Sequence, residues 1–303
     1  NMWAPDVIYN PIMGKWCMYL SLNGNQWNSS IILLTADNIA GPYVYQGPVV
    51  YSGFNGNNVG TIDPLATDLD LIYTNLSETG LPEKYAKGGS WGTFWPHAID
   101  PCVSYDEYGN LYMIYGSWSG GIYALQLDET TGLRDYTVVY PDINAGEASV
   151  TSDAYFGTKI AGGAYVSGEG AYVEKIGNYW YLFMSYGFYS PDGGYEMRIF
   201  RSDNIAGPYV DGAGNSAIFP GYVMNYGVNG DTRGEKLMGG YQWDTMTKGE
   251  IAQGHNSAFT DSKGNTYLVY HTKFNDGSVA HELRVHQLFV NEAGWLVAAP
   301  YEY

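Results

Sequence analysis

The sequence SGEGAYV at residues 167–173, followed by GNYWYLFMSY at residues 177–186, carries the pattern from which the fold can be predicted. Alternating aromatic and aliphatic residues on either side of a glycine turn predict two antiparallel strands joined as a hairpin. At the head of the first strand, Glu169 lies between two glycines, which allow a tight turn and leave room for another molecule to approach the carboxylate. A glutamate in an ordinary surface turn is the alternative interpretation.

The same plan of strand, glycine turn and aromatic strand recurs over residues 4–21, 100–117 and 255–271. Each unit adds a third strand, which we expect at residues 121–127 and 283–289 and over the nearly identical TADNIAGPYV (35–44) and RSDNIAGPYV (201–210). A repeated unit of several strands is typical of a β-propeller blade. A two-sheet sandwich would not repeat Asp-Asn-Ile-Ala-Gly-Pro-Tyr at the same place in two units.

We therefore predict an all-β chain that forms one propeller domain over residues 1–303. Long segments interrupt the repeat at about residues 54–95 and 142–168. Loops of this length in a compact domain usually form functional rims or lids, and we expect the same of these two.

The composition limits the classes of ligand. The chain has 303 residues, with Lys+Arg 14 against Asp+Glu 31 and a formal net charge of −17, which argues against nucleic acid or an anionic membrane as a partner. The 30 tyrosines and 9 tryptophans favour a neutral polyol such as carbohydrate, because sugar rings stack on aromatic faces. No stretch is long and apolar enough to span a membrane. Cys17 and Cys102 lie in strand-like runs without metal-ligand spacing and are predicted to be buried free thiols.

Acidic residues coincide with the heads of the first strands. Aligning the four units places Ala4, Asp100, Glu169 and His255 at equivalent positions. The heads of the first strands converge around the central axis of a propeller, so these residues are expected to lie near one another. Buried charge is costly unless it is paired or has a function, which favours a functional role for the two carboxylates. Two carboxylates beside aromatic residues indicate glycoside hydrolysis, in which one acid protonates the leaving oxygen while a carboxylate base activates water.

Several motifs then resemble family 43 glycoside hydrolases, above all the α-1,5-L-arabinanases, over essentially the whole chain. They are Trp3-Ala4-Pro5, Ile99-Asp100-Pro101, the Glu169 segment, the segment at residues 193–198, and Gly-His-Asn-Ser at residues 254–257. The resemblance implies a five-bladed β-propeller, of which four blades are visible in this sequence. It also implies inverting cleavage of α-1,5-linked L-arabinofuranosyl bonds in arabinan and arabino-oligosaccharides, in the endo mode or alternatively the exo mode.

The same resemblance implies roles for individual residues. Glu169 would be the general acid, and Asp100 would tune the pKa of that acid and orient the substrate. His255 matches a histidine that faces a metal ion, commonly calcium, held largely through water; a hydrogen-bonded core histidine is the alternative. The positions that would line the sugar site are Trp3, His97, Ser117 and Arg198, although Arg198 could instead form a surface ion pair. His271 is interpreted as structural.

One departure from the family concerns the general base, which the family carries ahead of its Trp-Ala-Pro motif. Because this sequence starts at that motif, we expect the N-terminal blade to be cleaved, truncated or present as a separate fragment, and we see no accessory sandwich domain. Strand alternation places Asp6 on the same side of the strand as Ala4 but two residues further along it, so we do not accept Asp6 as a substitute for the general base. Asp63 is a weaker candidate, since it lies in the first inserted loop.

Three other functions remain as alternatives. A carbohydrate-binding propeller that has lost catalysis would explain the absent base. A family 43 α-L-arabinofuranosidase or β-xylosidase would share the fold and the acids. A scaffold for protein partners would not need converging carboxylates. A polymeric substrate implies a protein that is secreted, periplasmic or attached to the cell surface. We expect a monomer.

Overall fold

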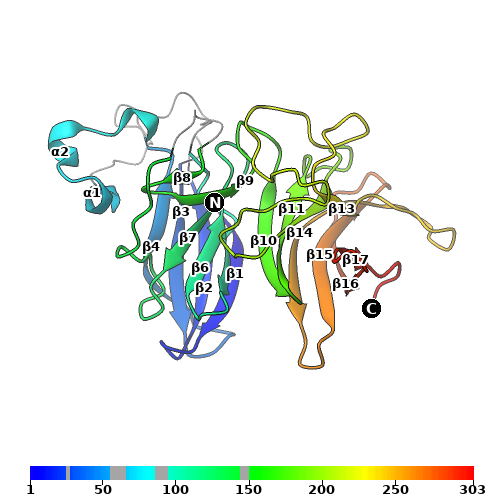
Figure 1. The fold of residues 1–303 in the computed structure, drawn as a ribbon. Coiled ribbons are helices and arrows are strands. Elements are labelled where there is room, and N and C mark those ends of the chain that lie inside the picture. The colour runs from blue at the N-terminus through cyan, green and yellow to red at the C-terminus, as the bar shows by residue number, and fades with distance from the viewer. Residues whose placement is uncertain (25–27, 55–65, 86–94, 144–149) are drawn as a thin grey trace. The chain divides into compact units, whose positions relative to one another are not determined.

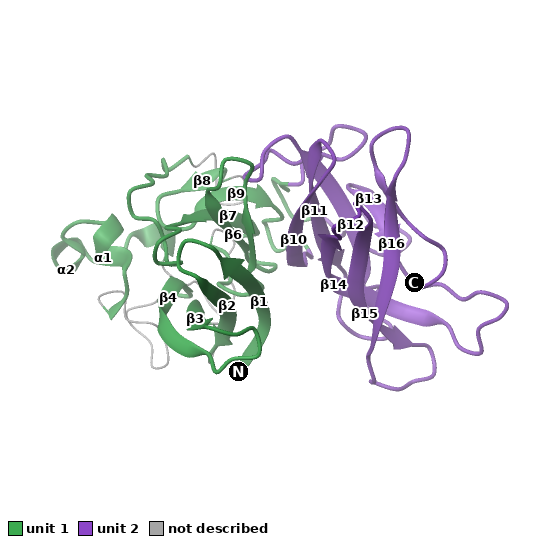
Figure 2. Ribbon diagram, turned by 90° about the horizontal axis from the view of Figure 1, so that it is seen from below, with its two compact units in different colours: residues 1–166, 218–222 green, residues 167–217, 223–303 purple. Residues whose placement is uncertain are grey.

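A computed structural model describes residues 1–303 except 25–27, 55–65, 86–94 and 144–149 (Figure 1). The described part of the chain folds into four antiparallel sheets, so the predicted all-β class is confirmed. The chain divides into two compact units, residues 1–166 with 218–222 and residues 167–217 with 223–303 (Figure 2). None of the helices in the described part has the length and apolar character that a membrane crossing needs.

Unit 1 contains two sheets whose strands follow one another as meanders. The first sheet has the order β1 (Met2–Asn10), β2 (Lys15–Asn23), β3 (Ser29–Ala36), β4 (Val44–Ser52). The second has the order β5 (Cys102–Tyr105), β6 (Leu111–Tyr115), β7 (Ile122–Leu127), β9 (Gly157–Ala161), with the short β8 (Ser152–Asp153) added at the edge.

Unit 2 contains the other two sheets, again as antiparallel meanders. The first consists of β10 (Glu169–Ile176), β11 (Tyr179–Tyr186), β12 (Glu196–Ser202) and β13 (Glu235–Met238). The second consists of β14 (Glu250–Thr260), β15 (Thr266–Phe274), β16 (Glu282–Val290) and β17 (Leu296–Ala298). A four-stranded antiparallel meander is the blade of a β-propeller, so the four predicted blades are present.

In two of the four blades, the hairpin between the first and second strands is closed by an aspartate. Asp261 Oδ1 accepts hydrogen bonds from the backbone N–H groups of Lys263 and Asn265, both at 2.8 Å. Asp106 makes the same pair of bonds to Tyr108 and Asn110 at 2.9 Å. An aspartate that satisfies its own turn in this way sets the register of the strands on either side.

The repeated Asp-Asn-Ile-Ala-Gly-Pro-Tyr sequence was expected to be a third strand, and this expectation was wrong. The third strands β3 and β12 end at Ala36 and Ser202, and the motif forms the turn that follows each of them. In both turns the asparagine Oδ1 accepts from the N–H two residues later, and the tyrosine hydroxyl donates to the isoleucine carbonyl at 3.0 Å. Proline has no N–H to contribute to a ladder, so the motif ends a strand rather than forming one.

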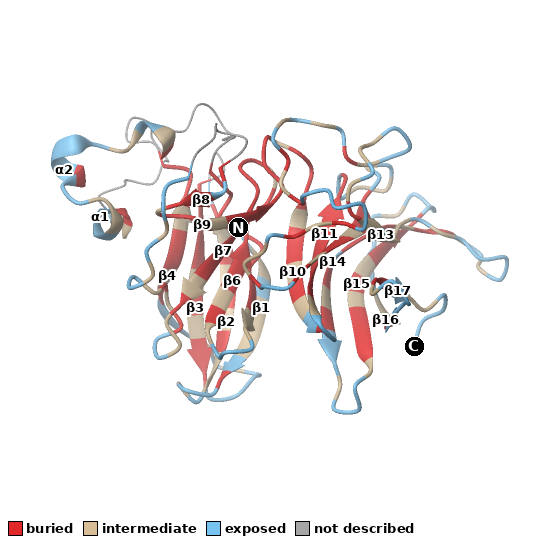
Figure 3. Cartoon of the chain, in the orientation of Figure 1, coloured by how far each residue is buried: buried red, intermediate tan, exposed pale blue. Residues whose placement is uncertain are grey.

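Buried residues are concentrated in the strands of each unit (Figure 3). The core of unit 1 includes Cys17, Leu33, Leu125 and Phe156, and the core of unit 2 includes Phe183 and Leu268 among others. Cys17 and Cys102 are both buried and free, as predicted. Each unit therefore has an apolar core of its own, which is what holds its pair of blades together.

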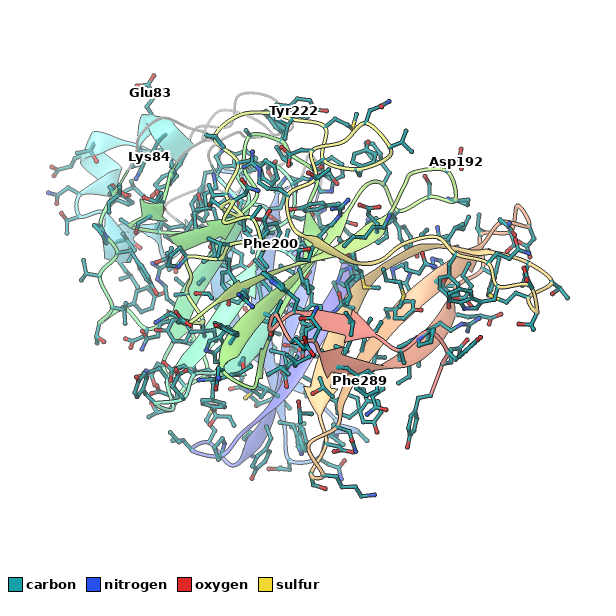
Figure 4. All side chains as sticks on the ribbon, turned by 45° about the vertical axis from the view of Figure 1, so that its right-hand side comes forward. Glu83, Lys84, Asp192, Phe200, Tyr222 and Phe289 are labelled. Atoms are coloured by element: carbon teal, nitrogen blue, oxygen red, sulfur yellow. The ribbon has the colours of Figure 1, made fainter. Side chains whose placement is uncertain are left out.

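The first inserted segment departs from the all-β pattern. Its described part forms three short helices, α1 (Leu69–Ile72), α2 (Leu76–Thr79) and η3 (Glu83–Tyr85). The side chains of η3 differ in environment, since Glu83 is exposed (Figure 4). Tyr85 is fully buried. The helices thus belong to the folded body of unit 1.

A buried carboxylate fixes η3 to the second sheet. Asp153 on β8 is fully buried and accepts from Tyr85 Oη at 2.8 Å and from Lys84 Nζ at 2.9 Å. The same carboxylate accepts the backbone N–H groups of Tyr155 and Phe156 at 2.8 and 2.7 Å. Four donors around one buried charge satisfy it fully, and the cation is part of that arrangement.

We predict that Lys84→Met lowers the free energy of unfolding by about 3 kcal/mol, because it leaves the buried charge of Asp153 without its cation. Lys15→Met is the matched control, since Lys15 pairs with Asp37, whose side chain is 87% exposed. The control should cost less than about 1 kcal/mol. Urea denaturation followed by tryptophan fluorescence measures both values, and equal losses in the two variants would contradict the role given to Asp153.

Candidate functional site

A two-residue bulge interrupts the first strand in three of the four blades. Pairing skips two residues between Trp3 and Asp6 in β1, between Glu169 and Tyr172 in β10, and between Gly254 and Ser257 in β14. The first bulged residue has a positive φ in each case, and Asp100 shares this geometry ahead of β5: Ala4 (44°), Asp100 (54°), Gly170 (57°) and His255 (46°). Non-glycine residues rarely adopt this conformation, and such strain is concentrated at functional sites.

The strand register in the structure shows that the sequence alignment of the first strands was wrong by one residue at Glu169. The sequence alignment made Glu169 equivalent to Asp100 and His255, but the residue of unit 2 with the same positive φ is Gly170. Glu169 pairs with Ser185 as Trp3 pairs with Ser21, so Glu169 corresponds to Trp3, one residue before the bulge. The alignment was anchored by matching Pro5 with Pro101 and Tyr9 with Tyr105 in the first two units, whereas the backbone aligns the residues that adopt positive φ.

Asp100, His97 and Ser117 are brought together in unit 1 as buried polar groups. The N–H of Asp100 donates to Ser21 Oγ on β2 at 3.0 Å, and the N–H of Ala98 donates to Ser29 Oγ on β3 at 2.9 Å. The segment that carries His97 and Asp100 is therefore bonded to the first sheet. Because Ser21 also pairs with Trp3, the predicted residues Trp3 and Asp100 share one neighbour.

His97 is held by a second serine. Its Nε2 lies 3.1 Å from Ser119 Oγ, and its ring lies 5.9 Å from the ring of Trp95. Ser119 is fully buried and follows the predicted sugar-site residue Ser117 by two positions. A buried imidazole with a hydroxyl partner has a defined orientation, so the ring of His97 is fixed within unit 1.

Asp6 bridges the two blades of unit 1. Its carboxylate accepts from the backbone N–H of Val7 at 2.9 Å and from that of Val103 on β5 at 2.6 Å. Burial raises the pKa of Asp6 to about 6, against the lowering effect of these two bonds. A carboxylate engaged by two backbone donors has a structural role, in agreement with its exclusion as a general base. Asp63 lies outside the described residues.

Glu169 and His255 occupy neighbouring strand heads of unit 2. Tyr195 donates its hydroxyl to Glu169 Oε1 at 2.8 Å. The N–H of His255 donates to Oγ of Ser185, the residue that pairs with Glu169, at 2.7 Å. A Cβ at Gly170 would lie only 3.0 Å from His255 Cα, so glycine is required for the two heads to approach. The structure therefore places the predicted acid and the predicted metal-facing histidine on adjoining blades.

The surroundings of His255 fit an ion held through water. The His255 side chain is exposed, whereas Gln253 and Asn256 are buried with amide groups that have no hydrogen-bond partner in the described part of the chain. Orphaned amides need polar partners such as ordered water. Within the same residues no three His, Cys, Asp or Glu side chains are close enough to chelate a metal directly. An oxygen-liganded ion with several waters is compatible with this set.

His271 is a packing residue in this structure. It pairs with Gly254 across β14 and β15, and its ring stacks on that of Tyr195 at 6.0 Å and 13°. Burial, with smaller effects from His255 and Lys273, lowers the pKa of His271 to about 4. The ring is thus neutral near neutral pH, in agreement with the structural interpretation from the sequence.

Arg198 on β12 forms an ion pair with Glu196, but not at the surface as the alternative interpretation had it, since the two side chains are only 12% and 8% exposed. Its Nε lies 2.8 Å from Glu196 Oε1 and its Nη2 lies 2.6 Å from the same oxygen, while Nη1 donates to the carbonyl of Gly234 at 3.0 Å. These bonds fix the plane of the guanidinium. A role in sugar binding stays a prediction.

Three residues of the site were not identified from the sequence: Ser21, Ser185 and Tyr195. A signal for the serines exists, because each stands at the same place near the end of an aromatic second strand, in YLSLN and FMSYG. Tyr195 lies in a loop before β12, and its approach to Glu169 depends on tertiary structure alone.

Comparison with known proteins gives consistent matches. The profile described as Glycosyl hydrolases family 43 matches residues 83–296. Extracellular endo-α-(1→5)-L-arabinanase 2 of Bacillus subtilis is 35% identical, over 100% of this chain and 58% of the relative. The extracellular endo-α-(1→5)-L-arabinanase of Thermotoga petrophila is 34% identical, with the same two coverages. The chain thus spans less than two thirds of the length of these relatives.

Solved structures agree with these matches. The crystal structure of endo-1,5-α-L-arabinanase from Thermotoga petrophila is 34% identical with a TM-score of 0.76, over 100% of this chain and 60% of that one. The α-L-arabinanase of Cellvibrio cellulosa in complex with arabinohexaose is 21% identical with a TM-score of 0.65, over 98% and 77% of the two chains. At 21% identity, the match to the Cellvibrio structure shows a shared fold.

We predict that Asp6 makes stability fall as pH rises. Its pKa of about 6 in the native state exceeds the ordinary value of 3.8, so its contribution is complete below about pH 4 and is lost as pH passes 6. Relative to Asp6→Asn, the wild type should lose about 2 kcal/mol of unfolding free energy between pH 4 and pH 7, allowing for the partly exposed side chain. Urea titrations at each pH test this, with Asp37→Asn as the exposed control; parallel profiles for wild type and Asp6→Asn would refute it.

We predict that Gly170→Ala lowers the free energy of unfolding by more than the strain of a positive φ alone would, because the new Cβ meets His255. Gly170 and Gly177 have similar φ values, +57° and +63°, but a Cβ at Gly177 meets nothing within 4 Å. Gly177→Ala should therefore cost about 1 kcal/mol of strain, and Gly170→Ala about 2–4 kcal/mol because His255 must also move. Denaturation, together with the imidazole NMR signals of His255, measures both effects. Equal costs with an undisturbed His255 would contradict the close approach.

Proposed function

Because this chain belongs to glycosyl hydrolase family 43, we propose that it hydrolyses α-1,5-linked L-arabinofuranosyl bonds of arabinan and arabino-oligosaccharides. The observation that carries the proposal is that each unit has a carboxylate at or beside a strained backbone position: Asp100 of unit 1 has a positive φ, and Glu169 of unit 2 directly precedes Gly170, which has one. The names of the two relatives that match the whole chain support the substrate. Those relatives are extracellular, and we propose the same location for this protein.

In the proposed mechanism Glu169 is the general acid. It delivers its proton to the glycosidic oxygen as the bond from that oxygen to the anomeric carbon breaks. Water attacks the opposite face while a carboxylate base takes up its proton, which inverts the configuration; this base is assigned to no residue of this sequence. The negative charge of Asp100 acts on the protonation of the acid and on the orientation of the sugar. The proposed sugar contacts are Trp3, His97, Ser117 and Arg198.

We also propose a metal ion near His255, with calcium as the first choice. His255 would face the ion, and the unpartnered amides of Gln253 and Asn256 would bond to its water shell. A divalent cation supplies positive charge that offsets the carboxylates of so acidic a chain. The residues themselves position the water network, since His255 is fixed by its N–H bond to Ser185.

A carbohydrate-binding propeller without catalysis is the second candidate. It is favoured by the head of β1, where Ala4 occupies the bulge position and provides no third acid. The two candidates differ in turnover, because a binding protein would retain arabinan but release no product.

We predict that the protein releases oligosaccharides or arabinose from linear arabinan and that the first-formed anomer is inverted, as seen by ¹H NMR. Glu169→Gln should lower kcat by about 10²–10⁴-fold, the usual contribution of a general acid. Glu292→Gln, at an exposed turn of the same unit, is the control and should keep full activity. Binding of arabinan without turnover in the wild type would replace the hydrolase by the binding protein, and full activity of Glu169→Gln would remove Glu169 from the mechanism.

A further inference from the structure

Tyr195 is buried next to the proposed acid. Only 2% of its surface is exposed, and its hydroxyl donates to Glu169 Oε1 at 2.8 Å. It precedes β12, whereas Glu169 begins β10, so the bond joins a loop to a strand head of the same blade.

The ring of Tyr195 is restrained by its neighbours. His271 stacks on it at 6.0 Å and 13°, and Tyr189 meets it edge-on at 5.8 Å and 77°. A Cβ at Gly254 would lie 2.2 Å from Tyr195 Cε1, so the backbone of β14 is in direct contact with the ring. A ring packed in this way has one rotamer, and its hydroxyl has one position.

We propose that Tyr195 is a positioning residue that holds the carboxyl group of Glu169 in the orientation needed for proton transfer to the leaving sugar. The inference rests on the proposed function, because it concerns the same reaction. Tyr195 donates one hydrogen bond throughout and neither gains nor loses a proton. It acts through Glu169.

The bond also distinguishes the two oxygens of the carboxyl group. Because Oε1 accepts from Tyr195, the transferable proton belongs on Oε2. After transfer, Glu169 is an anion, and a phenol hydroxyl donates more strongly to an anion than to a neutral acid. A donor already in place needs no rearrangement during the reaction, which is how fixed dipoles lower an activation barrier.

A purely structural tyrosine would behave differently. The chain offers a matched case in unit 2, because Tyr209 is also buried and donates its hydroxyl to the carbonyl of Ile205 at 3.0 Å. Removing either hydroxyl deletes one buried hydrogen bond, but only Tyr195 bonds to the proposed acid. Tyr209→Phe therefore measures what the loss of such a bond does to the fold in general.

The test compares Tyr195→Phe and Tyr209→Phe on two substrates. On linear arabinan, whose leaving sugar needs a proton, Tyr195→Phe should lower kcat about 10- to 100-fold, as for loss of a hydrogen bond to a charged group, and leave KM within about twofold. On a nitrophenyl α-L-arabinofuranoside, whose leaving group needs no proton, the loss should shrink to within about threefold. Tyr209→Phe should match the wild type on both. Equal losses on the two substrates, or no loss on arabinan, would overturn the proposal.

Two further measurements separate this inference from the proposed function. In a Glu169→Gln background, Tyr195→Phe should cause no additional loss of arabinan hydrolysis, since the two residues act as one unit. Crystal structures of the wild type and Tyr195→Phe should show Glu169 in one conformer in the first and in several, or a rotated one, in the second. If the wild type fails to hydrolyse arabinan, the proposed function falls while the structures still decide the positioning role. A Glu169 side chain that stays unmoved in Tyr195→Phe overturns that role.

Discussion

Within each unit, the position of the site residues depends on one kind of hydrogen bond, from the N–H of a residue with positive φ to a serine hydroxyl on the adjoining blade. In unit 1 the pair is Asp100 and Ser21, and in unit 2 it is His255 and Ser185. A bulge leaves the backbone unpaired within its own sheet, so its N–H needs a partner elsewhere. The serine supplies that partner and fixes where the head of the next blade lies. Asp100 and His255 are held in this way, and Glu169 pairs across the sheet with Ser185.

Strain at these heads is acceptable because each unit has a large apolar core. Positive φ at a non-glycine residue costs of order 1–3 kcal/mol, and it persists only where the surrounding structure enforces it. The strands below the heads are densely buried, as in β11, where seven of the eight residues are buried. Rigid strands of this kind let a carboxylate such as Glu169 keep one position while loop residues such as Tyr195 approach it.

Much of the fold could be predicted because blades repeat a local pattern. Glycine turns and aromatic alternation are short-range features, and the four blades follow from them. The Asp-Asn-Ile-Ala-Gly-Pro-Tyr segment was wrongly predicted as a strand because a repeated sequence shows that a local structure recurs but does not show whether that structure is a strand or a turn. The helices of the first insertion were missed because Tyr85 and Lys84 are held by Asp153, more than sixty residues away in the chain.

By itself, the sequence determined the all-β class, the four blades, the family and the residue types gathered at the strand heads. These follow from patterns within about twenty residues and from motifs that keep their order along the chain. Only the tertiary structure decided that Gly170, rather than Glu169, occupies the bulge. It also decided that Arg198 pairs with Glu196 and that Tyr195 reaches the acid. The reason is physical: a bulge shifts the register by a whole step, and contacts between loop and strand depend on packing that no local pattern records.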